Sequence, residues 1–379
     1  MSFYSKIIDL QKLSTAWDRV KKNRPACGVD NVTWEMFEEN RKEQLKQLNI
    51  SLENHEYVVM PVRMVTIYKG DKLRKVALYC MRDKVLQQSM ASELSKIYDG
   101  LFSDCVYAYR PGKSALEALE MITERIQREK FEWVLRLDIE HFFDTICVDR
   151  LITQMKGRIK EEDSLELIKT ICTAPSVSDT GILEKKRRGI YQGSAVAPVL
   201  SNIYLSEFDQ TMEKECDFYI RYSDDIIVLG RSRQILEELL TKVNLLLEKV
   251  GLTLNKSKTA ILPVEKGFHF LGYYFNKEGK AIPAKAEFSL LEKLETMWLT
   301  EKVKTIQEKL KKGAEILGGW EQYFREDREI ASIYEYVVVV YMIQNKKIDI
   351  LKLIEGRKIV NNFSTEICIY LYQFWEKLV

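Results

Sequence analysis

The chain has 379 residues, of which 46% are hydrophobic, and a formal net charge of +2. This composition predicts a globular protein with a sizeable core and two or three structural units, and it excludes a disordered or fibrous chain. No apolar run approaches the roughly 20 residues that a membrane span needs, and the first residues lack the apolar core of a signal peptide. We therefore expect a cytoplasmic protein with no membrane contact.

The cysteines and histidines predict no metal site, whereas the charged residues are unevenly distributed along the chain. The seven cysteines include no C-x-x-C pair and the three histidines are isolated, so neither a zinc site nor a disulfide framework is predicted. Residues 61–113 contain ten Lys or Arg against five acidic residues, a net charge of +5 that leaves −3 for the rest of the chain. This distribution suits a protein that meets phosphates on one face and keeps carboxylates for metals elsewhere, although a solvated surface segment gives the same pattern.

Helices and strands are predicted in alternation along most of the chain. Residues 1–60 are predicted to be mainly helical, and residues 60–80 to form two strands around a Gly-Asp turn. The remaining predicted elements are helices at 83–99 and 114–129, a strand that ends just after Asp138, a helix at 149–173, a hairpin at 180–190, a helix at 195–212, the hairpin "RYSDDIIVL", a helix at 232–250, strands up to about 275, and helices from about 286. This order predicts an α+β fold with an appended helical domain.

Two adjacent aspartates, Asp224 and Asp225, lie at the predicted tip of the "RYSDDIIVL" hairpin. One interpretation is ordinary turn chemistry, because Asp is a common turn residue. The other is a shared cation, since neighbouring carboxylates repel unless something positive lies between them. Asp138, at the end of a predicted strand, supplies a third carboxylate. Three such carboxylates favour two-metal nucleotidyl transfer, in which one ion activates the attacking hydroxyl and the other stabilises the leaving pyrophosphate.

Several segments resemble, in order and rough spacing, the sequence blocks of reverse transcriptases. These are "LDIEHFFDTI", "GIYQGSAVAPVLSNIYL", "RYSDDIIVL", "GLTLNKSKTAIL" and "FLGYYF". Upstream, the segments that resemble the group II intron-like bacterial lineage are "CGVDNVTWEMFEEN", "YKGDKLRKV", "RDKVLQQ" and "YAYRPGKSALEAL". The resemblance implies an RNA-directed DNA polymerase, a nucleotidyltransferase that binds an RNA template and dNTPs and releases a DNA product.

The fold implied by the resemblance is a right hand with an antiparallel palm sheet. Residues 1–130 would form the fingers with the start of the palm, and residues 131–280 the palm, with a fingers insertion at about 150–195. Residues 281–379 would form a helical thumb or C-terminal domain, in which "GWEQYFRE" resembles the thumb or maturase segment.

The resemblance also implies catalytic residues. The ligands of two Mg²⁺ ions, with Mn²⁺ as an alternative, would be Asp138, Ile139, Asp224 and Asp225. Asp138 and Asp224 would bind both ions directly, with Asp225 beside them as a supporting ligand. Lys258 matches the lysine proposed to protonate the leaving pyrophosphate, although a plain exposed lysine is the competing interpretation.

Further positions match the substrate-binding residues of the family. Phe143 matches the aromatic steric gate, whose bulk would clash with a ribonucleotide 2′-hydroxyl; alternatively, Phe142 and Phe143 could both belong to the core. The other matches are Lys69 and Arg74 for the triphosphate, Gln192 and Gly193 for the nascent base pair, and Arg110 for template or nucleotide phosphates. A solvated basic turn is the alternative for Lys69 and Arg74.

Some positions depart from the usual family pattern. Tyr191, Ala195 and Ala197 stand where Pro, Pro and Ser are common, and Ser223 stands where Ala is usual. The metal ligands are unchanged, so we expect polymerisation to survive, with template handling or fidelity altered.

The chain leaves no room after Val379 for the DNA-binding and endonuclease domains of a mobile intron protein. We therefore expect a domesticated enzyme in antiphage defence or a CRISPR-linked role, using a noncoding RNA and acting as a homo-oligomer or with a Cas or other defence partner. The alternative is an RNA-binding, maturase-like splicing cofactor.

Overall fold

The structure is a computed structural model that describes residues 2–324, except 70–71, 130, 179–180, 187 and 301–305. The chain divides into two compact units, Met1–Phe270 with Asn276–Gly279 and Leu271–Phe275 with Lys280–Val379. The helices predicted beyond residue 324 lie outside the described residues, and so does the longest apolar run of the sequence, within "YEYVVVVYMI" (334–343). Among the helices that the structure describes, none has both the length and the hydropathy of a membrane span.

Helices dominate the start of the first unit, as predicted. They are α1 (Phe3–Ile8), α2 (Leu10–Lys22), α3 (Trp34–Glu39), α4 (Arg41–Glu53) and α5 (Met81–Tyr98). The side chains of Ser2, Asp9 and Thr33 accept hydrogen bonds from main-chain N–H groups in the first turns of α1, α2 and α3, which accounts for where these helices begin. Trp17 of α2 is fully buried against Phe37 of α3, with ring centroids 4.3 Å apart.

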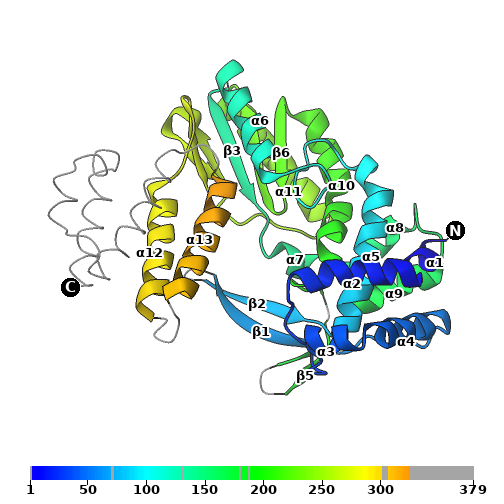
Figure 1. Ribbon diagram of the computed structural model, residues 1–379. Coiled ribbons are helices and arrows are strands. Elements are labelled where there is room, and N and C mark those ends of the chain that lie inside the picture. Colours follow the sequence, from blue (N-terminus) through cyan, green and yellow to red (C-terminus); the bar gives the residue numbers. More distant parts are fainter. Residues whose placement is uncertain are drawn as a thin grey trace. The chain divides into compact units, whose positions relative to one another are not determined.

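A long two-stranded ribbon, β1 (Val62–Lys69) and β2 (Lys72–Leu78), follows the first helices (Figure 1). Its antiparallel register pairs Lys69 with Lys72 around the predicted turn. The ribbon belongs to a sheet of order β2-β1-β4-β5, in which β4 is Ser176–Val177 and β5 is Leu183–Glu184. The hairpin predicted at 180–190 is therefore shifted, because the paired strands begin at Ser176 and end at Glu184.

The central sheet has the strand order β6-β7-β3-β8, and all its neighbours are antiparallel. Its strands are β3 (Trp133–Asp138), β6 (Phe218–Tyr222), β7 (Asp225–Gly230) and β8 (Ala260–Pro263). Four consecutive residues of β7, 226–229, are at most 1% exposed, so both faces of this strand are covered. Figure 1 shows the helices around this sheet, which are α6 (Ala115–Arg128), α10 (Ala197–Glu215) and α11 (Arg233–Lys249).

Two predicted elements are shorter or divided in the structure. The predicted helix 149–173 is two helices, α8 (Val148–Met155) and α9 (Glu162–Cys172), preceded by α7 (Phe142–Thr145). In "LTLNKSKTAIL" only β8 pairs as a strand, because Asn255 begins a turn in which its side chain accepts a hydrogen bond from the Ser257 N–H at 3.1 Å. Polar turn residues at these places outweigh the apolar periodicity.

The remaining described elements follow β8. They are β9 (Phe268–Phe270), β10 (Tyr273–Asn276), β11 (Gly279–Ala281), α12 (Ala284–Thr300) and α13 (Ile306–Tyr323). Within the second unit, the Tyr273 hydroxyl donates to the Tyr323 carbonyl at 3.1 Å, and the Tyr273 ring packs on Phe324 with centroids 5.0 Å apart. The described part of "GWEQYFRE" thus contributes aromatic packing to this unit.

A buried ion pair stabilises the β6–β7 hairpin. Arg221 of β6 and Asp209 of α10 are both fully buried and make two hydrogen bonds, Nε to Oδ1 at 2.7 Å and Nη2 to Oδ2 at 2.6 Å. Burial opposes charge on Arg221, but the Asp209 carboxylate outweighs it and the pKa of Arg221 is raised. Arg221 also donates through Nη1 to the Ser223 carbonyl at 2.9 Å, so the pair supports the turn that carries the aspartates.

A second buried acid, Asp83, lies in the first turn of α5. Its side chain is fully buried and accepts a hydrogen bond from the Tyr57 hydroxyl, while Oδ2 has no hydrogen-bond partner among the described residues. Burial raises the pKa of Asp83 to about 6, although the Tyr57 hydrogen bond and Arg82 act in the opposite direction.

The raised pKa of Asp83 predicts a pH-dependent contribution to stability. An unfolded Asp titrates near 3.9, so between about pH 4 and pH 6 the folded state holds more protons at this group than the unfolded state, and stability falls as pH rises. Asparagine has no proton to lose, so Asp83→Asn should not show this loss. Its free energy of unfolding, relative to wild type, should rise by about 3 kcal/mol as the pH is raised from 4 to 7. Urea unfolding at both pH values measures the difference.

The matched control is Asp104→Asn, because the Asp104 side chain is 87% exposed. Its stability should follow the wild-type pH profile. Parallel profiles for Asp83→Asn and wild type would show that Asp83 is not a proton-binding group with a raised pKa.

The buried ion pair predicts that replacing Arg221 lowers stability far more than replacing Arg231, the other arginine compared. Arg221→Met leaves Asp209 buried without a countercharge and should lower the free energy of unfolding by about 3–5 kcal/mol. The control Arg231→Met breaks a pair with Asp217 whose side chains are 63% and 64% exposed. It should cost less than about 1 kcal/mol. Equal effects of the two substitutions in urea unfolding would contradict the stabilising role of the buried pair.

Candidate active site

Sheet register brings two of the predicted carboxylates together. Asp138 is the last residue of β3 and lies directly opposite Asp225, the first residue of β7. Opposite residues of an antiparallel pair have Cβ atoms about 4.5–5.5 Å apart on the same face. Asp224 precedes Asp225 in the turn, and its carbonyl accepts a hydrogen bond from the Ile139 N–H at 3.2 Å. The four predicted metal-binding residues are therefore neighbours at one end of the sheet.

The turn that carries Asp224 has an unusual main-chain conformation. Ser223 adopts φ +61°, a left-handed value that is uncommon outside glycine. Its side chain accepts a hydrogen bond from the Tyr109 hydroxyl at 3.2 Å, and its carbonyl accepts from Arg221. The serine at this position is therefore used structurally, since an alanine would lose the hydrogen bond from Tyr109.

The electrostatics of the carboxylates show mutual repulsion. Burial, then Asp224, then Asp138 raise the pKa of Asp225 to about 6, while Arg136 and Lys258 act against the shift. The Lys258 ammonium donates to Asp138 Oδ2 at 2.6 Å, with the lysine side chain 41% exposed. Lys258 is thus a countercharge of the carboxylate cluster as well as a partly exposed lysine.

These residues suit a divalent ion chemically. Mg²⁺ prefers hard oxygen ligands and retains waters and substrate phosphates, so it needs few protein carboxylates. Ile139 offers only its main-chain carbonyl as an oxygen ligand. Within the part of the chain that the structure describes, no group of three or more His, Cys, Asp or Glu side chains is arranged to enclose an ion. The Asp138–Lys258 hydrogen bond would have to open before Oδ2 could bind a metal.

Phe142 and Phe143 differ in burial, which separates their predicted roles. Phe142 is 2% exposed and belongs to the core, whereas Phe143 is half-buried and packs against Phe142 with ring centroids 5.4 Å apart. The Phe143 carbonyl accepts a hydrogen bond from the Ile190 N–H at 2.8 Å, which joins α7 to the segment before Gln192. Phe143 is therefore the aromatic side chain of the two that substrate could reach.

Gln192 and Gly193 are exposed and lie against strand β2. The Ala77 N–H donates to the Gln192 carbonyl at 2.8 Å. Gly193 adopts φ +104°, and a Cβ on it would lie 2.5 Å from the Ala77 carbonyl oxygen. Glycine is therefore required for close approach to the β1–β2 ribbon, in addition to the predicted approach to the nascent base pair.

The two predicted triphosphate residues lie on the β1–β2 ribbon. Arg74 is exposed on β2, opposite Ile67 of β1. The main chain of Lys69 pairs with Lys72 at the end of the ribbon. The side chain of Lys69 and the turn residues 70–71 lie outside the described part of the chain, so the clamp role of this pair stays a prediction.

Arg110 uses its donors within the protein. Nε donates to Asp99 Oδ1 at 2.9 Å, Nη1 donates to the Ser103 carbonyl at 2.7 Å, and Nη2 donates to the Asp99 carbonyl at 2.9 Å. Its side chain is 7% exposed. Arg110 therefore stabilises the segment around Asp99 and Ser103. Its binding to phosphates stays a prediction, and it would require these hydrogen bonds to break.

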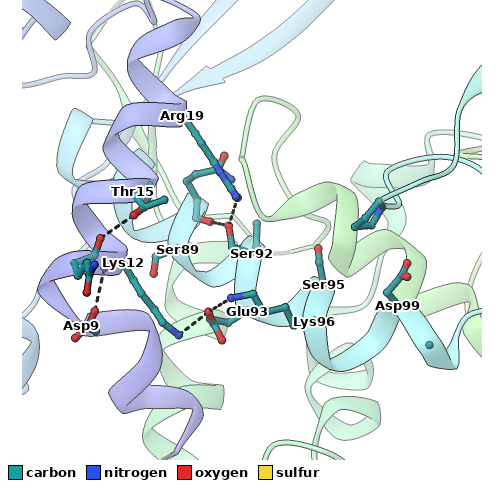
Figure 2. A pocket seen from close by; sticks show the side chains of 16 residues that line it. Asp9, Lys12, Thr15, Arg19, Ser89, Ser92, Glu93, Ser95, Lys96 and Asp99 are labelled. Atoms are coloured by element: carbon teal, nitrogen blue, oxygen red, sulfur yellow. Dashed lines mark hydrogen bonds and ion pairs between the residues drawn. The ribbon is translucent and has the colours of Figure 1, made fainter.

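A groove of about 810 Å³ lies away from the predicted catalytic residues, between α2 and α5 (Figure 2). Glu93 in it accepts hydrogen bonds from Lys12 and Lys96, each at 2.7 Å. None of the predicted site residues lines this groove. Its volume is therefore no guide to the polymerase chemistry.

Several residues near the carboxylates were not predicted from the sequence. Arg136, two residues before Asp138 on β3, faces the same side of the sheet and lowers the pKa of Asp225. Strand alternation could have identified it, because residues i and i+2 share a face. The partners Asp209 and Arg221, and the buried Gln87 of α5, leave no local sequence pattern.

Known proteins of similar sequence include intron-encoded proteins. Protein YkfC of Escherichia coli K12 is 28% identical over 286 residues, 65% of this chain and 74% of that protein. The group II intron-encoded protein LtrA of Lactococcus lactis is 30% identical over 204 residues, 52% of this chain and 32% of that protein. A solved structure of a Cas6-RT-Cas1–Cas2 complex has 24% identity and a TM-score of 0.42, covering 65% of this chain and 43% of that one.

The sequence pattern described as "Reverse transcriptase (RNA-dependent DNA polymerase)" matches residues 67–275, more than half of the chain. This range contains the end of β1, all of β2, the central sheet and all the predicted site residues. The predicted group II intron-like lineage agrees with the relatives, and the antiparallel central sheet agrees with a polymerase palm. The chain therefore belongs to the reverse transcriptase family.

Proposed function

We propose that this protein is an RNA-directed DNA polymerase that extends a primer with dNTPs on an RNA template. The observation that carries the proposal is the register pairing of Asp138 with Asp225, which gathers carboxylates at one end of the sheet beside Asp224. Burial and the neighbouring carboxylates raise the pKa of Asp225, so the cluster favours a bound cation, as a metal-dependent reaction requires.

We assign the metal ligands to Asp138, Asp224, Asp225 and the main-chain carbonyl of Ile139. Two bound Mg²⁺ ions, or Mn²⁺, would supply activation of the primer hydroxyl and neutralisation of the pyrophosphate. Lys258 hydrogen-bonds to Asp138 at the same cluster, which supports assigning it the role of protonating the leaving pyrophosphate. Arg74, with Lys69, would bind the triphosphate, and Gln192 and Gly193 would line the nascent pair.

The biological setting that we propose is a domesticated one. The enzyme would copy a noncoding RNA in antiphage defence or in a CRISPR-linked role, with a Cas or other defence protein as partner or as a homo-oligomer. This setting rests on the sequence resemblance. Sequencing the nucleic acid that co-purifies with the protein tests it, because a dedicated noncoding RNA should dominate the bound pool.

A second candidate function is an RNA-binding, maturase-like splicing cofactor. Its support is the sequence similarity to LtrA, a group II intron-encoded protein. The carboxylate cluster argues against it, since clustered negative charge repels an RNA backbone. Tight RNA binding without any nucleotide incorporation would favour this alternative.

Loss of the carboxylates should abolish polymerisation. We expect Asp224→Asn with Asp225→Asn to lower Mg²⁺-dependent dNTP incorporation on a primed RNA template by at least about 10³-fold, because metal-stabilised transition-state charge is worth several kcal/mol. The matched control is Asp217→Asn, whose side chain is 64% exposed next to the same hairpin. Incorporation that survives the double substitution would overturn the proposed mechanism.

Phe143 should set the choice between dNTPs and rNTPs. We expect Phe143→Val to lower the preference for dNTPs by about 10- to 100-fold, because space opens for a 2′-hydroxyl. Phe142→Val is the control, since that ring is in the core and its loss should lower the unfolding midpoint without changing the preference of the folded enzyme. The ratio of kcat/KM for the two nucleotide classes is the measurement. An unchanged ratio in Phe143→Val would remove Phe143 from the substrate site.

A further inference from the structure

The loop formed by residues 190–196 directly precedes α10 and contains the predicted nucleotide-contacting residues Gln192 and Gly193. It has no regular secondary structure, so its shape depends on contacts with other segments. Those contacts come from β2, from α5, from α7 and from the segment after α9.

Tyr191 attaches one end of the 190–196 loop. Its hydroxyl donates to the Ala174 carbonyl at 2.9 Å, and its ring lies edge-on to Tyr79 with centroids 6.3 Å apart. The Lys186 ammonium lies 3.8 Å from the centre of the Tyr191 ring. The tyrosine that replaces the usual proline is thus a buried anchor, with 6% of its surface exposed.

Gln87 contacts the other end of the 190–196 loop from the middle of α5. Its Oε1 accepts two hydrogen bonds, from Ser194 Oγ at 2.9 Å and from the Ala195 N–H at 3.0 Å. A main-chain N–H can only donate, so the atom facing Ala195 must be the amide oxygen. Gln87 is fully buried, and its Nε2 has no hydrogen-bond partner among the described residues.

The position of Gln87 rules out direct contact with substrate but not an effect on it. Ser194 and Ala195 directly follow Gln192 and Gly193, and the Ala77 N–H fixes the Gln192 carbonyl from β2. Strand β2 ends at Leu78 and α5 begins at Met81, so both contacts come from one continuous piece of chain. A change at Gln87 would therefore be transmitted within two residues to the exposed part of the loop.

We propose that Gln87 is a positioning residue that sets the geometry of Gln192 and Gly193 at the nascent base pair, and thereby nucleotide affinity and fidelity. This inference rests on the proposed polymerase function. Its acceptor oxygen is the functional group, and its amide nitrogen is dispensable. Two substitutions separate these features: Gln87→Met removes the acceptor at similar volume, and Gln87→Glu retains an acceptor oxygen in the same place.

The first experiment measures incorporation on a primed RNA template. We expect Gln87→Met to raise both the KM for dNTP and the misincorporation ratio roughly 5- to 10-fold, because two hydrogen bonds to a buried acceptor are lost, with kcat changed less than about twofold. Gln87→Glu should restore wild-type values, because burial keeps its carboxyl protonated and the neutral acid retains the acceptor oxygen. Gln88→Met is the matched control. Gln88 is the next residue of α5, but it lines the groove between α2 and α5.

Amide hydrogen exchange of the 190–196 loop provides a readout that does not need activity. We expect exchange in this loop to be roughly 3- to 10-fold faster in Gln87→Met, and unchanged in Gln87→Glu and Gln88→Met. Faster exchange together with an inactive wild-type protein would contradict the polymerase function while supporting the loop contact.

Three results would overturn the proposal. The first is a wild-type KM and fidelity in Gln87→Met. The second is a loss of kcat alone with a lowered unfolding midpoint, which indicates a purely structural role. The third is an equal defect in Gln87→Met and Gln87→Glu when both variants unfold at the wild-type midpoint, because the acceptor oxygen would then not be the group that matters.

Discussion

The candidate site depends on a sheet register that holds Asp138, Asp224 and Asp225 close together although their carboxylates repel one another. Asp138 and Asp225 are opposite each other in an antiparallel pair, and a shift of one residue would move every side chain of β7 to the other face. Because residues 226–229 are at most 1% exposed, such a shift would disrupt the core. Apolar packing thus enforces the proximity of charges that would separate if they were free to do so.

Cations near the cluster offset part of this repulsion, and they do so unequally. Arg136 comes from the same strand as Asp138, so the sheet fixes the position of its main chain relative to the carboxylates. Lys258 comes from the turn before β8, is partly exposed, and reaches Asp138 through a flexible side chain. The Lys258 side chain can leave Asp138 when a metal or phosphate competes for it.

The sequence was informative where local pattern decides structure. Asp138 and the Asp224–Asp225 pair could be identified because strands end at them, and the ribbon of β1 and β2 follows from its turn. The divided helix at α8 and α9 and the short strand β8 were missed, since polar turn residues interrupt an otherwise apolar periodicity. Roles that depend on distant partners left no local pattern. The contacts of Arg110 with Asp99 and Ser103 and the contact of Gln87 with a loop more than 100 residues away are examples.

Helix α10 connects the two parts of the site. It begins at Ala197, directly after the residues that Gln87 contacts, and Asp209 on the same helix binds Arg221, which supports the Ser223 turn. Twelve residues of α-helix separate these two points by roughly 18 Å along the axis. A helix buried along much of its length changes this distance little, so the spacing between the 190–196 loop and the carboxylates is set by one rigid element. Gln87 contacts the residues just before α10, and Asp209 lies further along the helix; these two buried polar side chains orient α10, and the oxygens that make the contacts are hydrogen-bonded.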